Sequence, residues 1–165
     1  MAETDLRRLP DEKSQRYAAL RVEIAAVLAG ETNLHARCAS IASMLRMAFG
    51  ARFFWCGFYL TDPSKPDELV VGPYQGTLGC LRIAFGRGVC GAAAATGRTQ
   101  IVPDVHAFPG HIACDSRSRS EIVAPVFDGE GRLIAVFDVD STEAAAFDAI
   151  DAEGIERILA ATFAA

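Results

Sequence analysis

The feature that most restricts the fold is a β-hairpin predicted in the C-terminal third of the chain. Two apolar segments, 121–127 and 132–140, are separated by the turn Asp128-Gly129-Glu130-Gly131. Short apolar segments joined by a glycine-containing turn are typical of adjacent antiparallel strands. Parallel neighbours instead need a long crossover between them. We therefore expect the chain to fold around an antiparallel sheet.

Helices are predicted on both sides of this sheet region in the sequence. Apolar residues recur at helical spacing over 13–29 and again from residue 34 to about Phe49, and a last helix is predicted over 147–163. Further short strands are predicted over 53–60, 69–74, 81–85 and 99–102. Helices at both ends of a partly hairpin-connected sheet indicate one α+β domain over 13–165, with a tail over 1–12.

Length and charge narrow the class of protein. The 165 residues suffice for one domain with a full core, but hardly for two. A net charge of −5 gives no basic surface for nucleic acid or an anionic membrane. We find neither an apolar run of transmembrane length nor a signal pattern, so we expect a cytoplasmic protein. In a reducing compartment, the five cysteines need an explanation other than structural disulfides.

The segment 108–123 contains the most unusual of these cysteines. Cys114 and His111 lie among turn-forming, hydroxyl and arginine residues, just before the apolar run that begins at Ile122. Such a polar setting can hold a thiol as a reactive thiolate. Cys80 and Cys90 also lie in glycine-rich or turn-rich segments, so a pair that forms a disulfide during turnover is the favoured interpretation.

The aromatic strand over 53–60 offers one face to a binding site. Alternation places Trp55, Gly57 and Tyr59 on one side of the strand. Two amphipathic aromatic residues that flank a glycine could form a pocket wall with room above Gly57, or part of the core. The opposite side is a core face, made of Phe54, Cys56, Phe58 and Leu60.

The hairpin also collects carboxyl groups. If Phe127 faces Arg132 across the turn, Glu121 lies opposite Asp138, and Asp140 shares their face of the sheet. Three carboxylates on one face repel each other unless a cation binds or one of them keeps its proton. They could form a solvated sheet face, or a site for an ammonium group with one acid able to deliver a proton.

Two other sites compete with this interpretation. The segment 86–91 fits G-x-G-x-x-G with Asp104 downstream, like a dinucleotide site, although the following hairpin argues against the parallel sheet that such a site needs. Zinc could bind Cys80, Cys90, Cys114 and His111, but no two cysteines have close C-x-x-C spacing. We therefore expect neither a metal nor another cofactor. The glycine-rich loop can still present N–H groups to a ligand carboxylate.

Taken together, several short motifs resemble one known family. They are Gly72-Pro73-Tyr74-Gln75-Gly76, Gly88-Val89-Cys90-Gly91, Asp104-Val105, the run from Phe108 to Asp115, the run from Ser118 to Val123, and Asp138-Val139-Asp140-Ser141. Over about residues 30–162 this pattern resembles the free methionine-(R)-sulfoxide reductases, which are GAF-domain enzymes. Tyr74, Cys56 and Phe137 depart from the residues expected there, which affects packing more than chemistry.

The resemblance implies a GAF-like domain that works as a cytoplasmic homodimer, reduces free L-methionine (R)-S-oxide and is recycled by thioredoxin. Cys114 would be the nucleophile, with Cys80 the favoured resolving thiol and Cys90 the other candidate. Trp55 and Tyr59 would hold the substrate side chain. Hydrogen bonds and protons would come from three acids, Glu121, Asp138 and Asp140. A GAF domain that senses a small molecule or an oxidant without turnover is the alternative.

Overall fold

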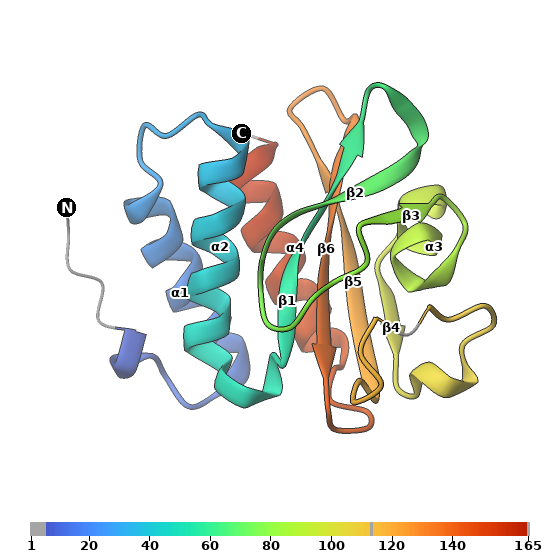
Figure 1. Ribbon diagram of the computed structural model, residues 1–165. Helices are drawn as coiled ribbons and strands as arrows, with labels where there is room; N and C mark the ends of the chain where they lie inside the picture. The colour runs from blue at the N-terminus through green and yellow to red at the C-terminus, as the bar shows by residue number, and fades with distance from the viewer. Residues whose placement is uncertain (1–5, 113, 165) are drawn as a thin grey trace.

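The computed structural model describes residues 6–112 and 114–164, and it contains one six-stranded antiparallel sheet between two layers of helix (Figure 1). The strand order is β3-β2-β1-β6-β5-β4. Helices α1, α2 and α4 lie on one side of the sheet, and α3 lies on the other. The predicted α+β class with a central antiparallel sheet is confirmed.

The elements follow the predicted order. The helices are α1 (Lys13–Val27), α2 (Leu34–Phe49), α3 (Gly88–Thr96) and α4 (Ala149–Phe163). The strands are β1 (Trp55–Asp62), β2 (Lys65–Gln75), β3 (Arg82–Ala84), β4 (Gln100–Val102), β5 (Ser120–Phe127) and β6 (Leu133–Ser141). Short 3₁₀ helices span Leu6–Arg8, Gly50–Arg52 and Val105–Ala107. Strand β2 begins earlier than predicted, because Lys65 already pairs with Asp62 across a tight turn.

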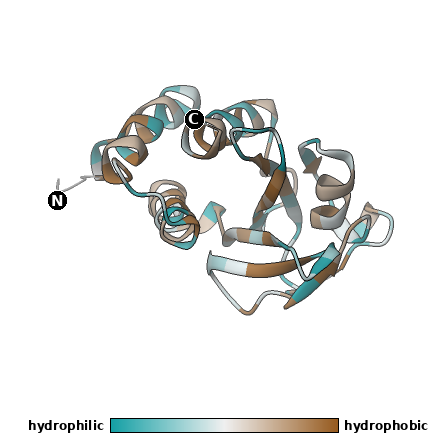
Figure 2. Cartoon of the chain, turned by 90° about the horizontal axis from the view of Figure 1, so that it is seen from above, coloured by the Kyte–Doolittle hydropathy of each residue, from teal (hydrophilic) through white to brown (hydrophobic). Residues whose placement is uncertain are grey.

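Side-chain alternation along the central strands produces two separate cores, one on each face of the sheet. Cys56 and Phe58 join the helices α1, α2 and α4 in the larger cluster, whereas Trp55 and Tyr59 join α3 in the smaller one. Figure 2 shows this layering from above, with helices that mix hydrophobic and hydrophilic residues. Phe54 is an exception to the predicted core face, because it precedes β1 and packs against the smaller cluster.

The hairpin of β5 and β6 forms with a different register from the predicted one. Phe127 pairs with Leu133 rather than Arg132, and a bulge between Val126 and Phe127 shifts the pairing by a further residue. The Asp128 carboxylate accepts hydrogen bonds from two backbone N–H groups of the turn, which draws residue 132 into the loop. Together these shifts move the register by two residues, and a shift of two keeps every side chain on its predicted face.

Gly57 does not leave open space in the pocket wall, contrary to the prediction. A Cβ atom at this position would lie 2.2 Å from the Tyr74 Cβ and 2.6 Å from the Tyr74 Cα. The Tyr74 ring stacks on Trp55, with 5.1 Å between the ring centroids. The glycine therefore allows β2 to approach β1 closely, and Tyr74 occupies the space expected for a ligand.

Replacing Gly57 with alanine should destabilise the fold strongly. The new methyl group would meet backbone and Cβ atoms of Tyr74, which cannot move aside as a flexible side chain would. Overpacking of this kind typically costs about 1–3 kcal/mol, and a clash with backbone falls at the upper end of that range. Urea unfolding should show the loss as a lower midpoint. Gly129→Ala is the matched control, because a Cβ atom at this position would have its nearest neighbour, the Ala164 carbonyl oxygen, at 3.6 Å.

The segment before α1 contacts the domain rather than standing apart from it. Leu6 and Leu9 are partly buried against the larger core cluster. The division into a tail over 1–12 and a catalytic domain over 13–165 stays a prediction. Among the described helices, none combines the length and the apolarity needed to cross a membrane.

Candidate active site

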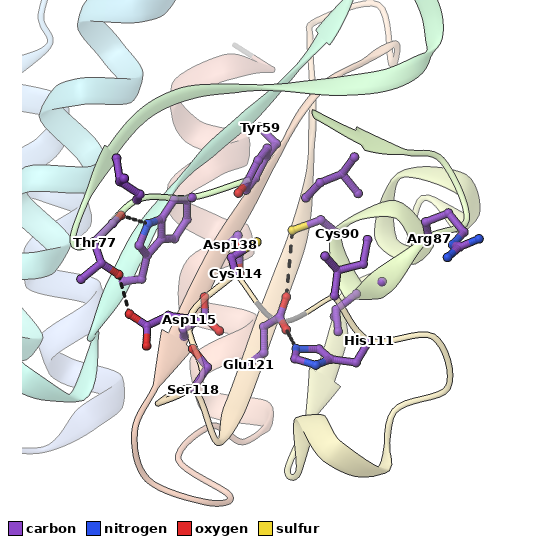
Figure 3. Close-up of a pocket in the computed structure, with 18 residues that line it drawn as sticks. Tyr59, Thr77, Arg87, Cys90, His111, Cys114, Asp115, Ser118, Glu121 and Asp138 are labelled. Carbon is purple, nitrogen blue, oxygen red and sulfur yellow. Dashed lines mark hydrogen bonds and ion pairs between the residues drawn. The ribbon is translucent and has the colours of Figure 1, made fainter. Parts of the chain in front are cut away.

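A pocket opens between α3, the smaller-core face of the sheet, and the loops around residues 77–79 and 111–118 (Figure 3). It contains about 510 Å³ of empty space, part of which is open solvent at its mouth. Seven of the eight predicted site residues line the pocket: Trp55, Tyr59, Cys90, Cys114, Glu121, Asp138 and Asp140. The eighth, Cys80, is joined to Cys114 at its edge.

Strand pairing explains how residues so distant in sequence reach one pocket. Asp140 of β6 pairs with Trp55 of β1 on one side and with Glu121 of β5 on the other. In the neighbouring row, Asp138 pairs with Gly57 on β1. The prediction that Glu121 faces Asp138 directly is therefore wrong, because the loop and bulge displace the register. The prediction that the three acids share one face is confirmed.

The three carboxyl groups are buried where charge is costly. Burial raises the pKa of Glu121 well above its ordinary value, and the carboxylates of Asp138 and Asp140 raise it further. The pKa of Asp138 is also raised well above its ordinary value, by burial and then by Asp140. Burial raises the pKa of Asp140 to about 6. The cluster can therefore keep a proton to a higher pH than ordinary carboxyl groups do.

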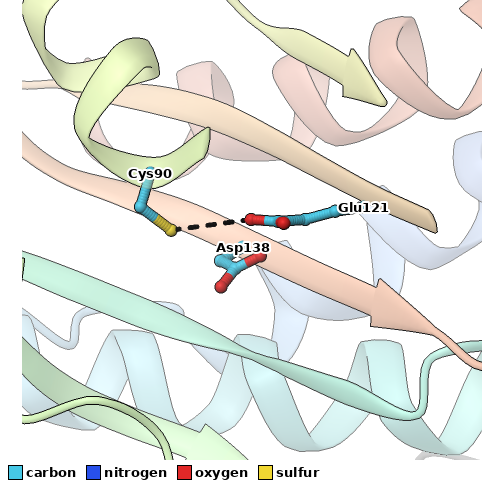
Figure 4. Close-up of side chains that lie close together, drawn as sticks. All are labelled: Cys90, Glu121 and Asp138. Atoms are coloured by element: carbon cyan, nitrogen blue, oxygen red, sulfur yellow. Dashed lines mark hydrogen bonds between the residues drawn. The ribbon is translucent and has the colours of Figure 1, made fainter. Parts of the chain in front are cut away.

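One carboxyl oxygen of Asp138 is buried without a hydrogen-bond partner. Its Oδ1 atom is the one buried side-chain nitrogen or oxygen without a hydrogen-bond partner in the described part of the chain. An unpaired buried acceptor is expensive, so its presence at a pocket indicates a ligand donor. Figure 4 shows Asp138 beside Glu121 and Cys90, with the Cys90 Sγ 4.0 Å from a Glu121 oxygen. The pKa of the Cys90 thiol is raised well above its ordinary value by burial.

Stability should depend on pH through Asp140. A carboxyl group whose pKa is raised on folding binds its proton more tightly in the folded state than in the unfolded state. Its contribution to stability is therefore greatest at low pH and is lost as the pH rises through about 6. The unfolding free energy of the wild type should fall between pH 4.5 and 8, and that of Asp140→Asn should fall less. The difference between the two falls should be on the order of 2 kcal/mol. Parallel pH slopes in urea titrations would contradict this.

The disulfide lies at the mouth of the pocket. Cys80 and Cys114 are 5.7 Å apart between their Cα atoms, and Cys114 is exposed. The three other cysteines, Cys38, Cys56 and Cys90, are free and buried. Because Cys80 and Cys114 are bonded to each other, the predicted alternative of a four-ligand zinc site is not assembled in this structure.

Hydrogen bonds hold the loop that contains Cys80 over the pocket. The Trp55 indole N–H donates to the Thr77 carbonyl oxygen at 3.0 Å, and the Thr77 hydroxyl donates to Asp115 at 2.9 Å. Gly79 lies so close to the Trp55 and Tyr59 rings that a Cβ atom there would be 2.9 Å from the Tyr59 hydroxyl. Both rings line the pocket and also belong to the smaller core cluster, so their role in holding a substrate stays a prediction.

The dinucleotide alternative is not supported by the surroundings of the glycine loop. Gly86 and Gly88 adopt left-handed backbone conformations and lead into α3, as the motif suggested. However, the sheet is antiparallel, and the Asp104 carboxylate accepts a hydrogen bond from the His106 N–H at 3.0 Å, capping a short 3₁₀ helix. Asp104 is therefore a structural residue.

Comparison with known proteins identifies the family. The GAF domain profile matches residues 33–165. A free methionine-R-sulfoxide reductase of Escherichia coli is 42% identical over 148 residues, covering 90% of this chain and 87% of that protein. The chain belongs to the free methionine-R-sulfoxide reductase family. The crystal structure of a family member from Neisseria meningitidis, in complex with its substrate, shares 48% identity with a TM-score of 0.87 over 93% of this chain and 89% of that one. The GAF domain-containing protein A of Dictyostelium discoideum is 46% identical, covering 96% and 97% of the two chains.

The pocket of this reductase family member also has lining residues outside the predicted site. Among them are Thr77, Arg87, Ile112, Ser118 and His111, the last predicted only as a zinc ligand. The His111 Nε2 lies 3.7 Å from a Glu121 oxygen, and burial lowers the pKa of this histidine. All five lie in loops or at a helix end, where side-chain periodicity gives no signal; nearby glycines and cysteines were the available clue.

Proposed function

We propose that this protein reduces free L-methionine (R)-S-oxide to L-methionine with its own cysteine thiols. The observation that carries the proposal is the Cys80–Cys114 disulfide at the mouth of a pocket lined by buried, proton-holding carboxyl groups. Relatives that cover most of the chain are named for this activity, and one was solved with its substrate. A disulfide in this position is the state expected after turnover.

In the first step, the Cys114 thiolate attacks the sulfur of the sulfoxide. The sulfoxide oxygen needs a proton as its bond to sulfur breaks, and the raised pKa of Glu121 makes it the favoured donor. The attack forms a bond between the two sulfur atoms. The protonated oxygen then bonds to the Cys114 sulfur as the sulfur–sulfur bond and the original sulfur–oxygen bond break, so methionine leaves as a thioether and Cys114 becomes a sulfenic acid.

In the second step, a resolving thiol attacks the sulfenic sulfur and releases water. We assign this role to Cys80, because the structure already joins it to Cys114. Cys90 is the other candidate. Its thiol is buried beside Glu121, and its raised pKa keeps it protonated, which makes it a poor nucleophile in this state.

The pocket has groups that suit a free amino acid. The Trp55 and Tyr59 rings, 5.7 Å apart between centroids, form an apolar wall for the substrate side chain. The unpaired Asp138 Oδ1 is the acceptor for the ammonium group, with Asp140 beside it. The substrate carboxylate is assigned to the N-terminal end of α3, where Arg87 and Gly88 line the pocket.

We also propose that the protein acts as a cytoplasmic homodimer and that thioredoxin reduces its disulfide. The resemblance to the family and the exposure of Cys114 support a protein reductant. We propose neither a nucleic acid nor a membrane as a partner, because the net charge of −5 gives no basic surface for either.

Incubation with racemic methionine sulfoxide and dithiothreitol, followed by chiral separation, tests the activity directly. The (R)-epimer should disappear with matching formation of methionine, while the (S)-epimer stays. Binding of the sulfoxide without any methionine formation would instead establish the alternative, a GAF domain that senses a small molecule.

A further inference from the structure

The two most exposed large hydrophobic side chains in the described part of the chain both lie next to the disulfide. Leu78 is 83% exposed and Leu81 is 76% exposed, and they stand two residues before and one residue after Cys80. The next most exposed, Met47 on α2, reaches 65%. Apolar groups that gather on one exposed site often mark a surface for a partner.

The backbone around both leucines is held in place, so their exposure belongs to the fold. The Val71 N–H donates to the Leu81 carbonyl oxygen at 3.0 Å, which fixes Leu81 beside β2. On the other side, Thr77 is hydrogen-bonded to Trp55 and Asp115, which positions the residue just before Leu78. These bonds fix the backbone on both sides of Cys80, and Leu78 also lines the pocket.

Charges near the leucines are already neutralised within the chain. Arg82, which follows Leu81, forms an ion pair with Asp62 at 2.8 Å. Arg117 and Asp115 pair with each other at 2.8 Å, close to Cys114 in sequence. The surface around the disulfide therefore offers a partner mainly apolar contact. That contact does not depend on complementary charge.

We propose that Leu78 and Leu81 form the docking surface for a protein dithiol reductant of the thioredoxin class. This inference rests on the proposed function, because a disulfide that forms in every turnover must be reduced in every turnover. A small dithiol can reach the exposed sulfur unaided. A protein must align its own thiolate with the disulfide, and apolar contact beside Cys80 provides that alignment.

The chemistry that docking serves is thiol–disulfide exchange. The partner's thiolate forms a bond to one sulfur of the Cys80–Cys114 pair, and the other sulfur leaves as a thiolate with the electron pair of the broken bond. The partner's second thiol then attacks this mixed disulfide. The protein ends with two reduced cysteines, and the partner ends with one disulfide.

The test measures reduction of the preformed disulfide without any methionine sulfoxide. Oxidised wild-type protein, Leu81→Ser and Leu78→Ser are each mixed with thioredoxin, thioredoxin reductase and NADPH, and separately with dithiothreitol. The readout is the ratio of the two reduction rate constants. We expect this ratio to fall about tenfold for Leu81→Ser and to fall also for Leu78→Ser. Met47→Ser, which removes an exposed apolar side chain on α2, should keep the wild-type ratio.

An unchanged ratio in both leucine variants would overturn the proposal. It would also be overturned if light scattering showed that Leu81→Ser turns a dimer into monomers, since the surface would then be an interface between copies of this chain. Because the assay uses no substrate, its result is independent of whether the protein reduces methionine sulfoxide.

Discussion

Replacing Cys114 with serine should abolish methionine sulfoxide reduction, lowering the rate at least a thousandfold with dithiothreitol as the reductant. Serine has nearly the same shape, but its hydroxyl is not ionised near neutral pH and cannot accept oxygen to form a sulfenic acid. Cys114 is exposed, so the substitution should leave the unfolding free energy almost unchanged relative to the reduced wild type, in which the Cys80–Cys114 bond is also absent. Turnover should be measured as methionine formed per chain.

Two other cysteine variants make this prediction specific. Cys80→Ser should keep much of the dithiothreitol-supported rate, because a small thiol can reduce the sulfenic acid directly, but it should lose the thioredoxin-supported rate. Cys38→Ala changes a buried free cysteine in the larger core cluster. The folded variant should keep its activity with both reductants. Wild-type turnover by Cys114→Ser would end the assignment of this residue as the nucleophile.

Replacing Glu121 with glutamine should lower kcat by on the order of 10²–10³-fold. The amide has the volume and neutrality of the protonated acid, but it has no proton to give to the departing sulfoxide oxygen. Because burial and two neighbouring acids raise the pKa of Glu121, the wild type should keep that proton to a higher pH than an ordinary carboxyl group and lose activity as the group ionises. This decline with rising pH should be absent from the residual activity of the variant.

The kinetic control is Glu130→Gln, at an exposed turn residue that forms an ion pair with Arg132. It should reproduce the wild-type kcat and pH profile. Asp138→Asn should instead act mainly on KM, since its unpaired oxygen is assigned to substrate binding. If Glu121→Gln kept kcat within threefold of the wild type, the proton would have to come from another group.

Side-chain alternation explains why the pocket could be predicted from sequence. It placed Trp55 and Tyr59 on one face of β1 and kept the acids of β5 and β6 together. The extra loop residue and the bulge each shift the register by one residue. Because the total shift is two residues, these side chains stay on their predicted face.

Other features depend on contacts that one strand or loop cannot reveal. The space above Gly57 is filled by Tyr74, which is set by an irregular pairing of β1 with β2. The choice of Cys80 over Cys90 as the partner of Cys114 follows from loop paths across the pocket mouth. His111 reaches Glu121 from a turn, where no periodicity indicates direction.

The most direct test of the central claim is a single turnover without any reductant. Fully reduced protein is mixed with excess methionine (R)-sulfoxide, methionine is quantified, and the disulfides are mapped by peptide mass spectrometry. We expect one methionine per chain and a new bond between Cys80 and Cys114. Methionine formation that leaves both of these cysteines reduced, or no methionine at all, would contradict the claim.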